Sequence, residues 1–318
     1  MSRIDHTNSR RIVLAGGSGV LGRLLARTLA GKGHEIIVLT RSPHVGGESR
    51  QVEWDARTLG VWRQELEGAA AVINLTGRSV NCRYSAVNRR LILESRVLST
   101  RVLGEAIAGC AAPPPTWLNA STATIYKHSF EQTMDETGEI AADNDAKDEF
   151  SVEVAQAWEQ ALAEAPTPNT RKIPLRIGIV FLKEQGTIFS ILRRLVRLGL
   201  GGSMAGGRQF VSWIHQQDFY RALEWILDHP ALHGPVNVVA PNPVTNREMM
   251  AVFRKVCGQS MGLPAARWML EIGAFVMRTE TELMIKSRRA VPAKLLDAGF
   301  QFHFPTFHAA LEEIERRT

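Results

Sequence analysis

The sequence predicts an α/β protein, a Rossmann doubly wound parallel sheet followed by a smaller, mostly helical C-terminal substrate lobe. Up to about residue 182, short apolar strands alternate with helices of ten or more residues, and a glycine-rich turn follows the first strand. After that point most of the pattern is helical. The 318 residues, 45% of them apolar, are enough to bury a large core.

Hydrophobic periodicity gives the elements in order. Strands are predicted at 10–16, 34–40, 69–77, 116–122 and 172–181. Helices between them are predicted at 20–33, 85–109 and 147–165. Later helices are predicted at 216–229, 245–258 and 266–278, with two more within 291–317. We expect a dinucleotide-binding domain at 10–182, completed by a strand that returns near 234–240, and a substrate lobe at 183–318.

Composition argues against several classes of protein. No apolar run reaches the ~18 residues of a membrane helix, and no signal-peptide core follows the polar first ten residues. Three scattered cysteines suit reduced thiols in a cytoplasmic protein. His229 and His233 have helical metal spacing, but Pro230 breaks that helix, so no metal is expected. The net charge of +6 is scattered, which speaks against nucleic acid and suits an anionic small molecule.

The glycine-rich turn LAGGSGVLG joins the first strand to the first helix. Gly16, Gly19 and Gly22 stand at three-residue intervals. The first glycine permits a tight turn, the second lets the backbone approach a pyrophosphate, and the third allows close helix–strand packing. The helix N-terminus then faces the anion. The context predicts a dinucleotide site rather than a bare structural turn.

The end of the second strand bears on the choice of dinucleotide. NAD enzymes usually place an acidic residue there, about 20 residues after the turn, to bind the ribose 2′-hydroxyl. This chain has Thr40, Arg41 and Ser42 instead. A guanidinium can bind a 2′-phosphate that a carboxylate would repel. NADP(H) is therefore favoured; the alternative is that Arg41 is only a solvated arginine at a strand end.

Stretches across nearly the whole chain, from Arg11 to Ile314, resemble the extended short-chain dehydrogenase/reductases. The first half contributes GGSGVLG, INLTG, ESR, the spacing SxxxxY and PLRIGIVF. The second half narrows the resemblance through RLGLGGSMAGGRQFVSWIHQQDF, GPVNVVAPNPVTNREM and VPAKLLDAGFQFHFP. These strings are similar to the atypical "epimerase family" branch, whose members carry a C-terminal domain of unknown function. Their usual name, nucleoside-diphosphate-sugar epimerase, rests on analogy.

The resemblance implies an NADP(H)-binding Rossmann fold and a branch-specific C-terminal segment at about 264–314. It also implies cofactor contacts, residue by residue. These are Ser18, Gly19, Val20 and Leu21 under the pyrophosphate, Thr40 and Arg41 at the 2′-phosphate, Leu75 and Thr76 beside the adenosine, Arg96 from its helix and Val180 toward the nicotinamide. For Leu75, Thr76 and Val180 the alternative is ordinary packing at strand ends, because backbone contacts do not depend on residue type.

The resemblance also raises a catalytic question. Hydride chemistry in the superfamily uses a tyrosine and a lysine, YxxxK, on one helix face, with a serine after the fifth strand. The ammonium lowers the phenol pKa from about 10 toward working pH. Here Phe150 stands in place of the tyrosine and Val154 in place of the lysine. Neither can move a proton, so the usual dyad is missing.

Ser121 and Tyr126, in NASTATIYKHSF, are the remaining catalytic candidates. Branch members resemble this chain in having an aromatic residue at the position of Tyr126. On extended backbone Lys127 would point away from the tyrosine, whereas His128 would share its side and could relay a proton. Three roles stay open for Tyr126: catalysis, lining of the substrate or nicotinamide site, and structure.

The stretch GGRQFVSWIH provides Arg208 and Trp213 as candidate substrate residues. Extended sugar-nucleotide enzymes place an arginine on a comparable segment, so the resemblance implies that Arg208 contacts an anionic substrate group. His215 and Asp218, at the start of a helix, are expected to cap or brace it.

We therefore predict a cytoplasmic, NADP(H)-binding oxidoreductase or epimerase-like enzyme. Its substrate would be a small polar carbonyl or hydroxyl compound or a nucleotide sugar. Whether it is an enzyme stays open, because the dyad is missing. The alternative is a non-catalytic NADP(H)-binding sensor or interaction protein, with a link to cell division as in some relatives. No membrane or nucleic-acid partner is expected, and the sequence leaves the oligomeric state open.

Overall fold

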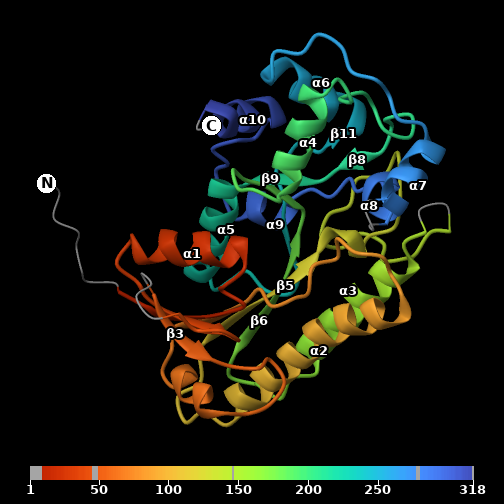
Figure 1. The fold of residues 1–318 in the computed structure, drawn as a ribbon. Coiled ribbons are helices and arrows are strands. Elements are labelled where there is room, and N and C mark those ends of the chain that lie inside the picture. The colour runs from red at the N-terminus through yellow and green to blue at the C-terminus, as the bar shows by residue number, and fades with distance from the viewer. Residues whose placement is uncertain (1–8, 45–48, 145–146, 277–279, 317–318) are drawn as a thin grey trace, which may run out of the picture.

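The computed structural model describes residues 9–44, 49–144, 147–276 and 280–316. A seven-stranded sheet crosses the molecule (Figure 1), in the order β10-β6-β5-β4-β1-β2-β3. Every pairing within it is parallel. Its strands are β1 (Arg11–Ala15), β2 (Glu35–Thr40), β3 (Arg50–Glu53), β4 (Ala71–Asn74), β5 (Thr116–Thr122), β6 (Arg171–Ile177) and β10 (Val236–Val238).

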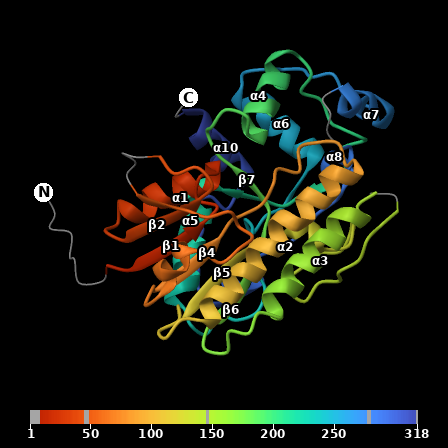
Figure 2. The same ribbon diagram turned by 60° about the horizontal axis from the view of Figure 1, so that its bottom comes forward.

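Helices cover both faces of this sheet, as Figures 1 and 2 show together. α1 (Val20–Ala30) and α5 (Gln216–Asp228) pack on one face, and α2 (Ala86–Ala108) and α3 (Glu149–Ala163) pack on the other. The strand order reverses between β1 and β4, and ligands of such sheets bind outside the carboxyl ends of the strands at this point. The predicted Rossmann class is confirmed.

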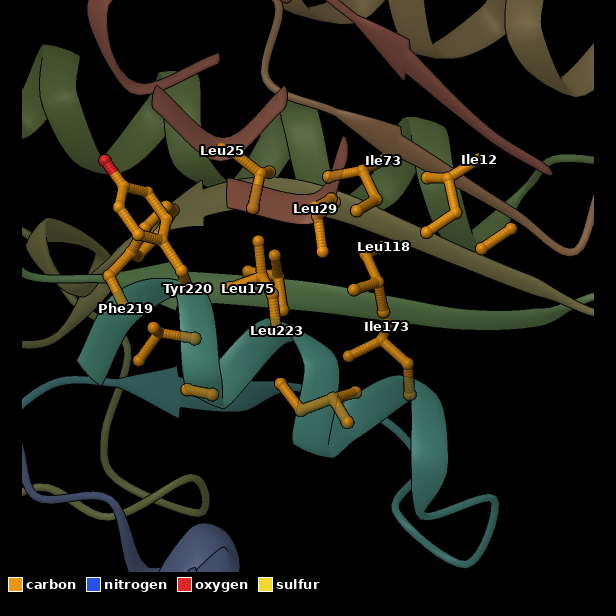
Figure 3. Packing of buried hydrophobic residues seen from close by; sticks show 14 of the residues in the cluster. Ile12, Leu25, Leu29, Ile73, Leu118, Ile173, Leu175, Phe219, Tyr220 and Leu223 are labelled. Atoms are coloured by element: carbon orange, nitrogen blue, oxygen red, sulfur yellow. The ribbon is translucent and has the colours of Figure 1, made fainter. Parts of the chain in front are cut away.

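The core follows from the alternation of side chains along buried parallel strands. Ile12 of β1 joins Leu25 of α1 and Leu223 of α5 in one apolar cluster (Figure 3). The next residue, Val13, lies in the cluster on the other face together with Trp117 of β5. A fully buried side chain of this kind contributes about 1.5–3 kcal/mol. Packing on both faces therefore fixes the strand ends that shape the site.

A further apolar cluster organises the second half of the chain. Phe181, Phe253 and Phe307 meet in its centre. Two small sheets border it, β7 (Ile179–Phe181) parallel to β9 (Trp213–His215), and β8 (Phe210–Val211) antiparallel to β11 (Val244–Thr245). The helices here are α4 (Ile188–Arg197), α6 (Asn246–Val256), α7 (Arg267–Val276), α8 (Glu282–Ile285), α9 (Ala293–Asp297) and α10 (Phe307–Arg316).

Some observed elements were not predicted. β3 reads RQVE, a polar edge strand with little apolar periodicity, and α4 lies in a stretch for which no helix was predicted. In the part of the chain that the structure describes, η2 (Val61–Leu66) and η3 (Ala123–Ile125) are 3₁₀ helices. β10, within the predicted range 234–240, pairs with β6 at the sheet edge, Val236 opposite Leu175. The proposed domain boundaries stay predictions.

Candidate cofactor groove and neighbouring polar network

The glycine turn between β1 and α1 is held by close backbone contacts. Gly16 has a φ of 75°, and a Cβ there would lie 2.8 Å from the backbone nitrogen of Thr76. A Cβ on Gly22 would lie 2.5 Å from Cα of Gly17. Only glycine fits both places without a shift of backbone. The turn therefore brings the start of α1 against the end of β4.

The N-terminus of α1 faces the edge of this turn. Its N-cap, Gly19, has no side chain to bond the first backbone N–H groups, and the first turn holds no acidic residue. Ser18 and Gly19 are exposed. Uncapped N–H groups and the positive end of the helix dipole favour a bound anion.

Seven of the predicted cofactor residues line one groove of about 390 Å³ at the carboxyl ends of β1, β2 and β4. They are Gly16, Ser18, Gly19, Thr40, Arg41, Leu75 and Thr76. Thr76 Oγ1 is buried and has no hydrogen-bond partner among the described residues. The volume lies within the range of small-molecule sites, about 300–1,000 Å³.

Three arginines, Asp55 and Glu94 line this groove, and Arg57 pairs with Glu94 at 3.1 Å. Arg41 is exposed at the end of β2, where no carboxylate stands, and Thr40 beside it is buried. Arg57 and Arg78 also line the groove. Sequence analysis missed these two arginines because their place follows from the unpredicted strand β3 and from the loop after β4. Asp55 lies on the wall, where hydrogen bonds from Thr58 lower its pKa.

The remaining predicted cofactor residues lie outside the groove lining. Leu21 and Val180 are half-buried and pack against the apolar cluster under α1. Val20 begins α1. Arg96 lies on α2, where it donates to the carbonyl oxygens of Arg78 at 3.1 Å and Ile92 at 3.0 Å. Burial lowers the pKa of Arg96 to about 10. Arg96 thus holds the backbone of Arg78, a residue that lines the groove.

Ser121 at the end of β5 faces α3. Its hydroxyl donates to Glu159 Oε1 at 2.6 Å. Glu159 in turn accepts two hydrogen bonds from the Arg176 guanidinium, from Nε and from Nη2, each at 2.9 Å. Ser121 is only 5% exposed, so its hydroxyl belongs to a buried ionic network.

Tyr126 belongs to the same network. Its hydroxyl donates to Asn237 Oδ1 at 2.7 Å and accepts from Arg176 Nη1 at 2.9 Å, and the side chain is 1% exposed. Burial raises the pKa of Tyr126 to about 12, although Arg176 opposes the rise. A proton donor tuned to neutral pH needs the opposite shift. The catalytic role of Tyr126 stays a prediction, and this geometry argues against it.

On α3, the two residues at the positions of the usual dyad have apolar surroundings. Phe150 and Val154 are buried together with Ile92. The ring of Tyr84 meets Phe150 edge to face, 5.0 Å between centroids. Neither of these two side chains can donate or accept a proton.

Lys127 and His128, the neighbours of Tyr126, contact different parts of the chain. Lys127 pairs with Glu139 at 2.9 Å on the surface. His128 Nδ1 accepts from the backbone N–H of Ser287 at 2.9 Å. His128 thus joins this turn to the C-terminal segment, a contact that local sequence could not indicate.

The two predicted substrate residues differ in their exposure and in their contacts. Arg208 is exposed, 5.2 Å from the centroid of the Phe130 ring. Trp213 is 0% exposed, and its Nε1 donates to the carbonyl oxygen of Asn242 at 2.9 Å. Its substrate role stays a prediction that the burial opposes. His215 caps α5 by accepting from Gln217 N–H, as predicted.

Among the described residues, no group of three or more histidine, cysteine or acidic side chains is placed to hold a metal. In the same part of the chain, no helix has the length and apolarity to cross a membrane.

Comparisons with known proteins show the family of this chain. The NAD dependent epimerase/dehydratase family model matches residues 12–240, and a domain of unknown function, DUF1731, matches residues 265–314. The chain is 31% identical to epimerase family protein ML0860 of Mycobacterium leprae, over 94% of each. It is 31% identical to epimerase family protein SDR39U1 of Bos taurus, over 96% of this chain and 99% of that one.

Solved structures are similar over almost the whole chain. Human epimerase family protein SDR39U1, crystallised with NADPH, has a TM-score of 0.85 and 28% identity, covering 97% of this chain and 100% of that one. A nucleoside-diphosphate sugar epimerase from Corynebacterium glutamicum has a TM-score of 0.77 and 26% identity, covering 97% and 58%. The resemblance seen in the sequence is thus confirmed, and the chain belongs to the NAD dependent epimerase/dehydratase family.

Proposed function

We propose that this chain binds NADP(H) and uses it in an oxidoreductase or epimerase-like reaction. The substrate would be a small polar carbonyl or hydroxyl compound or a nucleotide sugar. The observation that carries the proposal is the groove in which the uncapped start of α1 faces Arg41 and no carboxylate ends β2. The NADPH of the human relative and the name of the bacterial epimerase support the cofactor and the substrate class.

Each part of the groove has a physical role in this proposal. The N–H groups of the first turn of α1 would hold the pyrophosphate. Arg41 would bind the 2′-phosphate, and the unpaired Thr76 Oγ1 can hydrogen-bond the dinucleotide. When bound, NADP(H) supplies or accepts a hydride.

Thr122 is the better candidate than Ser121 for holding a substrate oxygen. Successive side chains of β5 point to opposite faces, so Thr122 points away from Glu159. Its hydroxyl is half-buried and shares a 2.8 Å hydrogen bond with the Thr124 hydroxyl. Such a pair can orient a substrate oxygen and pass a proton, whereas the Ser121 proton is committed to Glu159.

A second candidate function is a non-catalytic NADP(H)-binding sensor or interaction protein. The observation that favours it is the loss of proton chemistry on two sides of the site. Phe150 and Val154 replace the dyad, and the Tyr126 hydroxyl is locked between Asn237 and Arg176. Transfer of deuterium from C4-labelled NADPH to a carbonyl compound would decide for the enzyme. Tight NADPH binding without transfer to any compound of a broad carbonyl panel would decide for the sensor.

Cofactor choice can be tested by comparing NADPH and NADH affinity in Arg41→Ala. We expect NADPH affinity to fall about 10- to 100-fold, because one charge-assisted phosphate contact is lost, while NADH affinity stays the same. Arg63→Ala is the matched control, because Arg63 is exposed outside the groove and the net charge changes equally. An unchanged ratio of the two affinities in Arg41→Ala would refute the 2′-phosphate role.

A further inference from the structure

The C-terminal segment 280–290 lies against the place where the usual dyad would act. Glu280 accepts from the backbone N–H of Tyr84 at 2.7 Å. Glu282 Oε2 accepts from the Ser151 hydroxyl, at the start of α3, at 2.8 Å. This segment therefore contacts both the start of α3 and the loop that carries Tyr84.

Lys286 anchors the segment from within. Its ammonium forms an ion pair with Asp148, both side chains being 0% exposed, and donates to the carbonyl oxygen of Thr124 at 2.5 Å. The Lys286 charge is thus neutralised inside the protein. Lys286 positions the segment beside the Thr122–Thr124 pair.

The backbone of Arg288 is fixed on both sides. Its N–H donates to the carbonyl oxygen of Phe210 at 2.8 Å, and its carbonyl accepts from the Ser212 hydroxyl at 2.7 Å. The neighbouring Ser287 N–H donates to His128. These hydrogen bonds hold in place the backbone from which the Arg288 side chain extends.

Unlike its backbone N–H and carbonyl groups, the Arg288 side chain has donors without hydrogen-bond partners among the described residues. Its Nε and Nη2 atoms are enclosed and have no hydrogen-bond partner among the described residues. Oε1 of Glu282, a side chain that is 3% exposed, is also enclosed and unpartnered in that part of the chain. The two groups are close enough to stabilise each other's charges, and burial lowers the pKa of Arg288 and raises the pKa of Glu282. Enclosed donors and acceptors without partners are costly, so such atoms mark a place for a ligand or an ordered water.

We propose that Arg288 and Glu282 form the substrate-recognition site, and that its ligand is a small monocarboxylate which also carries a hydroxyl or ammonium group. This inference rests on the proposed function and names its substrate class. Nε and Nη2 form one edge of the guanidinium, whose two parallel N–H bonds match the two oxygens of a carboxylate. Glu282 Oε1 is a pure acceptor when ionised and requires a donor from the ligand.

The charges around the site limit how much negative charge a ligand can bring. Lys286 and Arg288 are balanced by Asp148 and Glu282, which interact with them electrostatically. A monocarboxylate adds one negative charge beside Arg288, whose Nε and Nη2 have no hydrogen-bond partner among the described residues. A phosphate dianion would bring a second negative charge beside two buried carboxylates, at a higher cost.

The test uses the whole chain loaded with NADPH and two probes, glycolate and glycine, followed by calorimetric titration. We expect at least one probe to bind, about tenfold more tightly than acetate, which lacks the donor, and than glycolamide, which lacks the charge. Arg288→Lys keeps the charge but loses the two-pronged edge, so it should weaken probe binding about tenfold or more. Arg289→Lys is the matched control, since it is the same change in the neighbouring arginine, whose Nη1 donates to the Glu131 carbonyl, and it should bind the probe as the wild type does.

The outcomes separate the two proposals. NADPH binding is measured first, and its absence in the wild type would refute the proposed function. If NADPH binds but neither probe does, or if Arg288→Lys binds the probe as tightly as the wild type, the recognition site is refuted. Tighter binding of inorganic phosphate than of glycolate and glycine would refute the ligand class. Unfolding curves of Arg288→Lys establish that a loss of binding is not a loss of fold.

Discussion

The candidate cofactor groove and the Tyr126 network lie at the same edge of one sheet, but they differ in whether their polar side-chain atoms have hydrogen-bond partners. In the groove, Thr76 Oγ1 has no partner among the described residues and Arg41 is exposed. In the network, the Ser121 hydroxyl is hydrogen-bonded to Glu159, and the Tyr126 hydroxyl is hydrogen-bonded to Asn237 and Arg176. The difference shows that residue type alone does not tell whether a polar side chain can bind a ligand. A side chain whose hydrogen bonds are already made within the protein stabilises the fold instead.

The largest expected effect comes from Arg176→Met, which breaks the network. Arg176 is 4% exposed and bridges Glu159 and Tyr126. Its loss leaves the Glu159 carboxylate, whose side chain is 15% exposed, without its cation, so the free energy of unfolding should fall by about 3 kcal/mol, measured in urea. Lys127→Met, which breaks a surface pair with Glu139, should cost less than about 1 kcal/mol. If folded Arg176→Met lost NADPH binding, the separation of network and groove would be wrong.

Gly16→Ala should break the groove instead. The added Cβ meets the backbone of Thr76 at a positive φ, so the turn must move and NADPH affinity should fall about 100-fold. Gly33→Ala isolates the conformational cost, because Gly33 has a φ of 88° and nothing lies within 4 Å of the added atom. It should lose only about 1 kcal/mol of stability and bind NADPH normally. Equal effects of both changes on NADPH affinity would contradict the contact argument.

Tyr126→Phe is expected to have the smallest effect, a loss of about 1 kcal/mol of unfolding free energy from the two hydroxyl contacts. The folded-state pKa of about 12 lies above the ordinary value, so the neutral phenol stabilises the fold fully below pH ~10. That stability is lost as the pH rises from about 10 to 12, and the variant should lose less over this range. Urea unfolding at intervals from pH 9 to about 11 measures it.

Measurements of turnover can show that Tyr126 is catalytic after all. If the rate with a carbonyl substrate depends on a group that titrates near neutral pH, and Tyr126→Phe abolishes that rate, the tyrosine is the proton donor that its sequence context suggests. Retained turnover in the variant would leave the Thr122–Thr124 pair as the candidate.

Sequence predicted the parts of the structure that depend on local pattern. The order of strands and helices follows from apolar periodicity, and seven of the predicted cofactor residues meet in one groove because the ends of β1, β2 and β4 share an edge. The absence of the dyad was also readable, since Phe150 and Val154 occupy fixed places on an amphipathic helix.

The rest depended on contacts between distant segments. Arg176 lies 50 residues after Tyr126, and Asn237 lies 111 residues after it. No periodicity indicates that these side chains saturate the tyrosine hydroxyl. Arg57 and Arg78 enter the groove through a polar strand and a loop, whose paths are set by tertiary packing.

The Lys286–Asp148 ion pair has a consequence for the architecture. The dinucleotide-binding family model ends at residue 240, yet the carboxylate at the start of α3 is neutralised by an ammonium from the segment 265–314. Removing that segment would strand a buried negative charge inside the Rossmann half. The Lys286–Asp148 pair joins the parts of the chain that the two family models match, so we expect these parts to unfold together.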